Sequence, residues 1–358
     1  MKRVFLGLCL LAWAVSGETV RIQAASSGIE GTWSARVYVS EKAVSDPERL
    51  QLQISLDENG RNWNNWGQSI PRSAFTNLPA DLDAQQDARF ELRREAGAIA
   101  FRGTFESGRG IGYLTFTPNR EFARVMEQQT NESVSDRDLF SYAILDVSEA
   151  FVKEMQALGF ADLTLAGARK LRIHGVTADY VREIRAAGLG GADLDDVVQL
   201  RIHGVTAEYA REMRALADGE TLDAGDIRQL RIHGVTPAYV KEMRDAGLAA
   251  SLRDLRQSRI HGVTPSFANE MAALGYKGLD LRELRQFRIH GVTPSYVKAM
   301  ADLGYRDVSA TTIVKFRIHG ITPSFVKELK DAGYTNLSDE ELVDWAIHGR
   351  RLLRSKRK

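Results

Sequence analysis

This chain of 358 residues contains little cysteine, few long apolar runs and little net charge. The single cysteine, Cys9, excludes a framework of disulfides within the chain. It lies in an apolar run over residues 4–15, which is too short to cross a bilayer. The formal net charge is +1, so the composition gives no reason to expect nucleic acid as a partner.

Common catalytic motifs are also absent from the sequence. It contains no His-Glu-x-x-His zinc motif, no phosphate-binding Gly-Lys-Ser/Thr loop and no Gly-x-Ser-x-Gly nucleophile elbow. The glycine-rich segment 108–112 lacks the spacing of a dinucleotide-binding fingerprint. All seven histidines belong to one repeated sequence word, which leaves none for a Ser/His/Asp triad. We therefore expect a protein that is not an enzyme and that uses no cofactor.

The first residues follow the order of a secretory signal. Two basic residues precede the apolar run, and the small residues Ser16 and Gly17 follow it. This order predicts a signal peptide over residues 1–17, with cleavage near residue 24 or 25 as the alternative. Cleavage would remove Cys9 and leave a mature chain without a transmembrane segment, suited to the periplasm or to secretion. The other interpretation of the run is a buried N-terminal strand.

Residues 27–117 alternate apolar and polar side chains, as β-strands do. Strands are predicted over residues 33–39, 50–56, 90–93, 99–105 and 111–117, with a hairpin turn at 107–110. About six short strands predict a small antiparallel β barrel or sandwich. Trp63 and Trp66 stand among amides and are candidate ligand-binding residues, because such rings stack on a sugar or a peptide. The alternative places one tryptophan in the core and the other at its rim.

The second half of the chain repeats the word Arg-Ile-His-Gly-Val-Thr with small changes. Its histidines are spaced by 29, 30, 28, 29, 29 and 29 residues, a period typical of stacked repeats. In one copy, His290 would be a helix C-cap and Gly291 would take the left-handed position after it. Thr293 and Pro294 would then cap and open the next helix. Aromatic residues recur at the same period from Phe122 onward, so the pattern predicts eight helix pairs.

The sequence therefore predicts an α+β protein, in which a small antiparallel β barrel or sandwich precedes an all-α solenoid of about eight helix-pair repeats. Its parts are the signal peptide, a β domain over 27–117, a helical array over 118–349 and a basic tail over 350–358. In the first pair, residues 144–148 are a degenerate copy of the word, which indicates a capping repeat. The basic tail has three alternatives: contact with the rest of the protein, which is acidic, contact with an anionic surface, or no contact.

The repeated arginines and histidines allow three interpretations. Equivalent residues in stacked repeats lie about 8–10 Å apart, too far to share a metal ion with ligands at about 2.0–2.3 Å. An anion-binding ladder is the second interpretation, although glutamates recur in the first helices and would pair with the arginines. The favoured interpretation is structural, because a cation in the last turn of a helix offsets the helix dipole by about 0.3–1 kcal/mol. The residues concerned are Arg172, His174, Arg201, His203, Arg231, His233, Arg259, His261, Arg288, His290, Arg317 and His319.

The word Gly-Val-Thr-Pro-x-Phe/Tyr-Val/Ala-x-Glu-Met, followed by Gly-Tyr, resembles repeats at the C-terminal, extracytoplasmic end of bacterial membrane metallopeptidases of the beta-lactam-sensor type. Related secreted proteins carry similar repeats, and residues 90–119 resemble the β segment before them. The resemblance implies a bacterial envelope location. It transfers no catalytic residue, because this chain lacks the zinc motif and the membrane helices of the enzymes.

These observations lead us to expect a non-enzymatic binding or scaffold module that contacts a protein partner through its helical-repeat surface. One alternative is binding of a glycan or a peptide by the β domain at Trp63 and Trp66. Another is binding of an anion by the arginine and histidine ladder.

Overall fold

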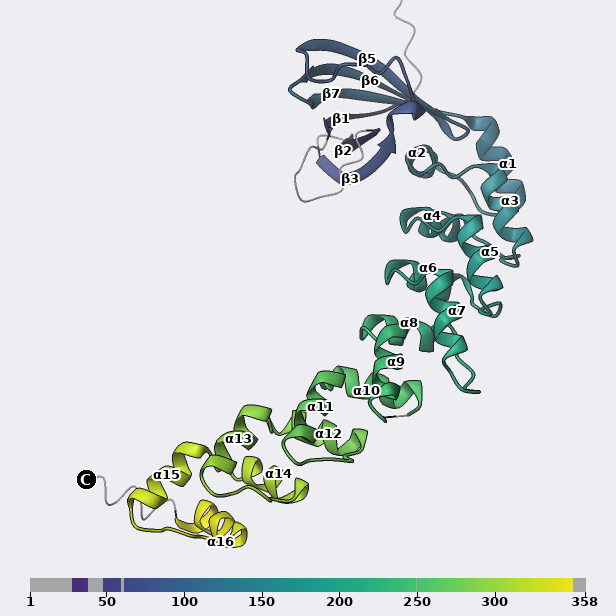
Figure 1. The fold of residues 1–358 in the computed structure, drawn as a ribbon. Coiled ribbons are helices and arrows are strands. Elements are labelled where there is room, and N and C mark those ends of the chain that lie inside the picture. Colours follow the sequence, from purple (N-terminus) through teal and green to yellow (C-terminus); the bar gives the residue numbers. More distant parts are fainter. Residues whose placement is uncertain (1–27, 38–47, 59–60, 249, 350–358) are drawn as a thin grey trace, which may run out of the picture. The chain divides into compact units, whose positions relative to one another are not determined.

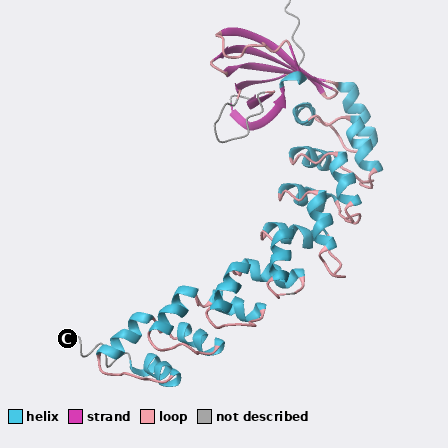
Figure 2. Ribbon diagram, in the orientation of Figure 1, coloured by secondary structure: helices cyan, strands magenta, loops and turns pink. Residues whose placement is uncertain are grey.

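The computed structural model describes residues 28–37, 48–58, 61–248 and 250–349, without the side chains of residues 57–65. The predicted signal peptide, Cys9 and the basic tail lie outside these residues. Within them a seven-stranded antiparallel sheet precedes sixteen α-helices (Figures 1 and 2). The predicted α+β fold class is therefore confirmed. The chain divides into two compact units, with the boundary between Glu149 and Ala150.

The first unit is built on one curled sheet with the strand order β3-β2-β1-β7-β6-β5-β4 (Figure 1). Alternate residues point into the core, where the ring of Trp33 lies edge-on to Phe90 at 5.2 Å and to Phe101 at 5.9 Å. The Trp33 Nε1 donates to the Tyr113 carbonyl at 3.1 Å, which satisfies the one polar atom of this buried ring. The strands are β1 (Ile29–Arg36), β2 (Arg49–Glu58), β3 (Arg61–Pro71), β4 (Phe75–Thr76), β5 (Gln86–Arg94), β6 (Gly97–Glu106) and β7 (Arg109–Pro118).

The first helix pair belongs to the same unit as the sheet. It consists of α1 (Arg120–Thr130) and α2 (Asp136–Leu145), and α2 packs on β5, β6 and β7. The Phe140 ring of α2 meets Phe116 of the sheet edge-on at 5.4 Å. Asp146 ends α2 in the left-handed conformation, with φ 58°, and its carboxylate pairs with the Arg94 Nε at 2.9 Å. An aspartate held by the sheet thus takes the place of the glycine that ends the later copies.

The helices of the second unit stack in pairs, each helix against the equivalent helix one repeat on. The first helices of the pairs are α3 (Glu149–Ala157), α5 (Ala178–Ala186), α7 (Ala207–Ala215), α9 (Pro237–Asp245), α11 (Pro265–Ala273), α13 (Pro294–Asp302) and α15 (Pro323–Asp331). The second helices are α4 (Leu165–Ile173), α6 (Leu194–Ile202), α8 (Ala224–Ile232), α10 (Leu252–Ile260), α12 (Leu281–Ile289), α14 (Ala310–Ile318) and α16 (Asp339–Asp344).

The repeated corner between two helices forms as the sequence predicts. His290 is the C-cap of α12, Gly291 has φ +71°, and the Val292 N–H donates to the Phe287 carbonyl at 2.7 Å. Thr293 then accepts from the backbone N–H of Tyr296 at 3.1 Å and starts α13. This arrangement is a Schellman motif joined directly to an N-cap.

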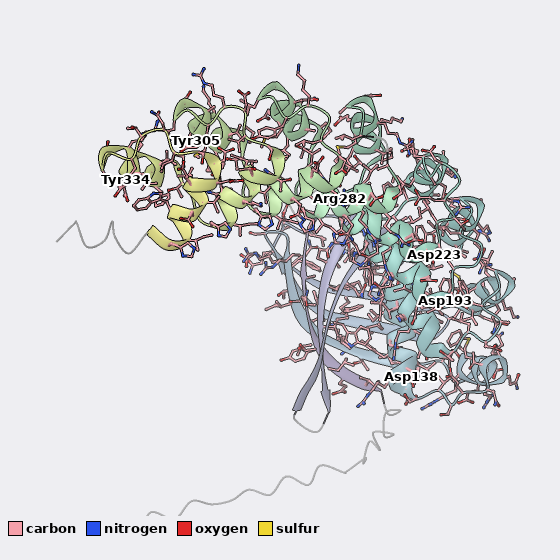
Figure 3. The ribbon with its side chains drawn as sticks, turned by 90° about the horizontal axis from the view of Figure 1, so that it is seen from below. Asp138, Asp193, Asp223, Arg282, Tyr305 and Tyr334 are labelled. Atoms are coloured by element: carbon pink, nitrogen blue, oxygen red, sulfur yellow. The ribbon has the colours of Figure 1, made fainter. Side chains whose placement is uncertain are left out.

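The second helices begin at side-chain N-caps. Figure 3 labels two of their N-cap residues, Asp193 and Asp223, which follow one another along the array. Each accepts from the backbone N–H three residues on and forms a capping box. Ser251, Asp280, Ser309 and Ser338 are N-caps that accept the same bond.

The last copy departs from this pattern. Here α16 continues into a π-helical turn over Trp345–Gly349, and the Trp345 ring packs on Tyr334 at 4.3 Å.

In the part of the chain that the structure describes, no helix is both long enough and apolar enough to span a membrane.

Candidate functional site: the repeated corner of the helical array

Each repeated arginine lies over the aromatic ring of the helix that precedes it. The Arg201 guanidinium carbon is 5.1 Å from the centre of the Tyr180 ring, and Arg317 is 4.8 Å from the Tyr296 ring. The same contact recurs at 4.8–5.2 Å for Arg172, Arg231, Arg259 and Arg288. Such cation–π pairs contribute about 0.5–1 kcal/mol at exposed sites. The arginines therefore stabilise the stack itself.

Two of these arginines also bind a carbonyl of the preceding corner. The Arg201 Nε donates to the Gly175 carbonyl at 3.1 Å, and the Arg317 Nε donates to the His290 carbonyl at 3.2 Å. Those carbonyls lie at the C-terminal ends of α4 and α12, where the helix dipole is negative. The guanidinium thus offsets the dipole of the neighbouring repeat. This geometry supports the structural interpretation of the arginines, although three of them, Arg201, Arg231 and Arg288, keep an exposed surface.

The tyrosines under these arginines link one corner to the next. The hydroxyl groups of Tyr180, Tyr209, Tyr239 and Tyr296 donate to the carbonyls of Val205, Val235, Val263 and Ile321 at 2.7–3.1 Å. Burial raises the pKa of Tyr180 and of Tyr239 to about 12, although the adjacent Arg201 and Arg259 lower it. These hydroxyl groups therefore stay protonated and act as donors across the interfaces between repeats.

The six histidines from His174 to His319 are helix C-caps that stay near the surface. The His290 Nε2 lies 3.1 Å from the Gln286 Oε1 one turn earlier. The described ranges contain no group of three His, Cys, Asp or Glu residues with the geometry of a metal site. The structure thus places each histidine beside its own helix end, and it brings no two ladder histidines to one centre.

The isoleucine of the repeated word is exposed in every copy of the second unit. The exposed fraction runs from 43% at Ile232 to 54% at Ile318. In α12 the buried residues are spaced by three, ending at Phe287, and Ile289 follows two positions later, off the buried stripe. Because the second helices pack one against the next, these side chains form a row, with steps of about 8–10 Å. We call this row the isoleucine ladder: Ile173, Ile202, Ile232, Ile260, Ile289, Ile318 and Ile347.

The degenerate copy in the first unit shows the same position covered. Its isoleucine, Ile144, is 5% exposed, in the helix α2 that packs on the sheet. The neighbours that correspond to Arg and His of the word are Ala143 and Leu145, and both are buried. Where a folded domain lies against this helix, the corner is thus apolar and buried. In the later copies the same isoleucine faces solvent.

The two candidate tryptophans differ in what the structure describes. Trp66 is half-buried, and its ring meets Phe140 of α2 edge-on at 6.4 Å. It therefore takes part in the packing between the sheet and α2. The side chain of Trp63 lies outside the described residues.

The comparisons with known proteins add no identity to this geometry, because no protein family, curated protein or solved structure matches the chain. The sequence pattern predicts the arginines and histidines as the candidate ladder and does not single out the isoleucine between them. The signal for it was present, since an isoleucine recurs in all seven copies although it falls off the buried stripe.

Proposed function

We propose that this protein is a non-enzymatic binding module of the bacterial cell envelope that holds a partner protein along the isoleucine ladder. The observation that carries the proposal is the exposure of one large apolar side chain at the same place in seven successive repeats. A single exposed isoleucine is ordinary on a protein surface. A regular row of apolar side chains with arginine and histidine on either side is typical of an interaction surface.

The packing of α2 supports a protein as the partner. There the equivalent isoleucine is buried in a helix that packs on the sheet. The location rests on the signal-like N-terminus and on the resemblance of the repeats to extracytoplasmic ones.

The expected size of the effect follows from the exposed area. Full burial of an isoleucine side chain is worth about 1.5–3 kcal/mol, so covering one that is half exposed contributes about 1 kcal/mol. Replacing two isoleucines of the ladder by serine should therefore weaken binding by about 2 kcal/mol, which is about thirtyfold in Kd. The fold should be retained, because these side chains contribute little to the core.

The test uses a photo-reactive amino acid at Ile232 or Ile289 in the native cells, with the same group at Ile111 as the control. Ile111 is 64% exposed on the sheet and lies outside the ladder. We expect a protein cross-linked from the ladder positions and not from Ile111. With that protein purified, the double variant Ile232→Ser/Ile260→Ser should lose affinity and Ile111→Ser should not. Equal affinity of both variants would contradict the proposal.

A further inference from the structure

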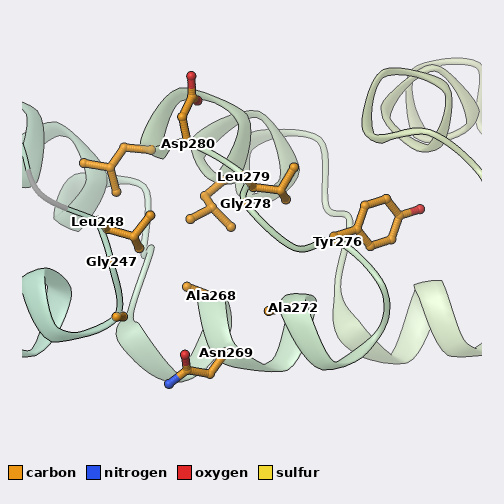
Figure 4. A pocket seen from close by; sticks show the side chains of 12 residues that line it. Gly247, Leu248, Ala268, Asn269, Ala272, Tyr276, Gly278, Leu279 and Asp280 are labelled. Carbon is orange, nitrogen blue, oxygen red and sulfur yellow. The ribbon is translucent and has the colours of Figure 1, made fainter.

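A cleft lies at the end of the second helices opposite to the isoleucine ladder. It separates the end of α9, one side of α11 and the start of α12, and it has a volume of about 420 Å³. Figure 4 shows Ala268 and Ala272 on α11 along one side, with Leu279 across the cleft from them. Ala246 and Leu248 close the end beside α9.

In other repeats a basic side chain reaches this place from the first helix of the next pair. The Arg244 Nη2 donates to the Leu216 carbonyl at 2.7 Å, and the Lys330 Nζ donates to the Leu303 carbonyl at 2.7 Å. Arg185 donates to the Leu158 carbonyl in the same way. These carbonyls lie at the C-terminal ends of first helices, where unpaired carbonyls and the negative end of the dipole favour a cation.

At the cleft the residue in this position is Ala272. The segment Glu242-Met243-Arg244 of α9 corresponds to Glu270-Met271-Ala272 of α11, so the basic side chain is missing here, as it also is at Ala301 of α13. Among the described residues, none donates a hydrogen bond to the carbonyl of Ala246. The cleft thus keeps the acceptor and lacks the donor.

Gly247, which follows Ala246, has free space beside it. A Cβ added at Gly188 would lie 2.6 Å from the Nε of Arg214, the basic residue of the next first helix. A Cβ added at the equivalent Gly247 would meet nothing within 4 Å. An arginine side chain therefore has room beside Gly247.

We propose that this cleft binds an arginine side chain presented by a partner polypeptide, which takes the place of the missing basic residue. The guanidinium would donate to the Ala246 carbonyl at the negative end of α9. Leu248 and Leu279 line the cleft and would cover the aliphatic part of the side chain. This site is separate from the isoleucine ladder, so the two proposals are tested independently.

The test measures binding of N-acetyl-arginine N-methylamide to the full chain by NMR of labelled alanine methyl groups. Three alanines line the cleft, so saturable shifts are expected at Ala246, Ala268 and Ala272, with Kd in the millimolar range that is usual for so small a ligand. The citrulline analogue has the same shape without the charge and should produce at most a tenth of the response at equal concentration. An equal response to both ligands, or no saturable response to the arginine ligand, would overturn the proposal.

Variants then locate the site. Ala272→Arg supplies the chain's own guanidinium, as Arg244 does one repeat earlier, and should abolish the response. The matched control is Ala301→Arg, which makes the same change at the equivalent position of α13 and should leave the response intact. Ala272→Lys supplies an amine for the same carbonyl, as Lys330 does two repeats on, and should also abolish the response, which provides a second test if Ala272→Arg does not fold. A response unchanged by both Ala272→Arg and Ala272→Lys would refute the site.

Discussion

The hydroxyl of Tyr209 offers a direct test of how the repeats are held together. It donates to the carbonyl of Val235 at 2.7 Å across the interface between two repeats, and both residues are buried. The substitution Tyr209→Phe removes the donor and keeps the ring under Arg231. A buried carbonyl that loses its partner costs about 1–3 kcal/mol. We expect a loss of about 1–2 kcal/mol in the free energy of unfolding.

The chain contains a natural counterpart to this variant. Phe267 occupies the same position in α11, under Arg288 at 4.8 Å, and has no hydroxyl to offer the buried Val292. Phe267→Tyr should therefore add the missing bond and stabilise the array by about 0.5–1.5 kcal/mol, the usual net worth of a hydrogen bond. One substitution removes a hydroxyl group and the other adds one at the equivalent position, so their effects on stability should have opposite signs.

The assay is equilibrium unfolding in urea, followed by circular dichroism and fitted with a model of coupled neighbouring repeats. In an array of this length, 1 kcal/mol should move the melting temperature by about 2–4 °C. An unchanged stability after Tyr209→Phe, or a loss of stability after Phe267→Tyr, would refute the view that these hydroxyl groups join the repeats.

Two further predictions concern alkaline pH and the corner glycine. Because burial raises the pKa of Tyr180 and Tyr239 from 10.0 to about 12, the fold favours their protonated form. Their contribution is therefore complete below pH 10 and is lost as the pH rises towards 12, at about 1.4 kcal/mol per pH unit for each tyrosine. Titration of phenolate absorbance alongside circular dichroism checks this prediction. Ionisation of Tyr180 and Tyr239 near pH 10 in an intact fold would contradict it. Gly291→Ala should cost about 1–2 kcal/mol, because φ +71° is strained for alanine. Gly225→Ala, inside α8, should instead be neutral or stabilising in the same urea assay, and a similar loss at both sites would show that the left-handed conformation is not the cause.

Much of the fold could be predicted from the sequence because the decisive interactions are local. A left-handed glycine after His290 and a threonine cap at Thr293 involve atoms within a few residues of each other. Alternation in the sequence predicts the strands, except β3, whose many amides and paired tryptophans hide the apolar pattern, and β4, which has only two residues. The degenerate word in α2 was also visible in the sequence. The reason for the change is the ion pair between Asp146 and Arg94 of the sheet, which the sequence does not show.

The candidate sites depended on contacts between residues that are distant in sequence. The sequence places an arginine in the last turn of each second helix, but only the packed structure shows that Arg201 lies over Tyr180 and reaches the corner before it. The cleft beside Ala272 likewise appears only when α9, α11 and α12 come together.

The sequence by itself determined the period of the repeats, the corners and the helix caps, because short-range hydrogen bonds and backbone preferences specify them. Tertiary structure alone decided which side chains remain exposed. The isoleucine of the word is buried at Ile144 and exposed at Ile289, although both lie in the last turn of their helices. The difference arises from what packs against each helix, and no local pattern encodes that.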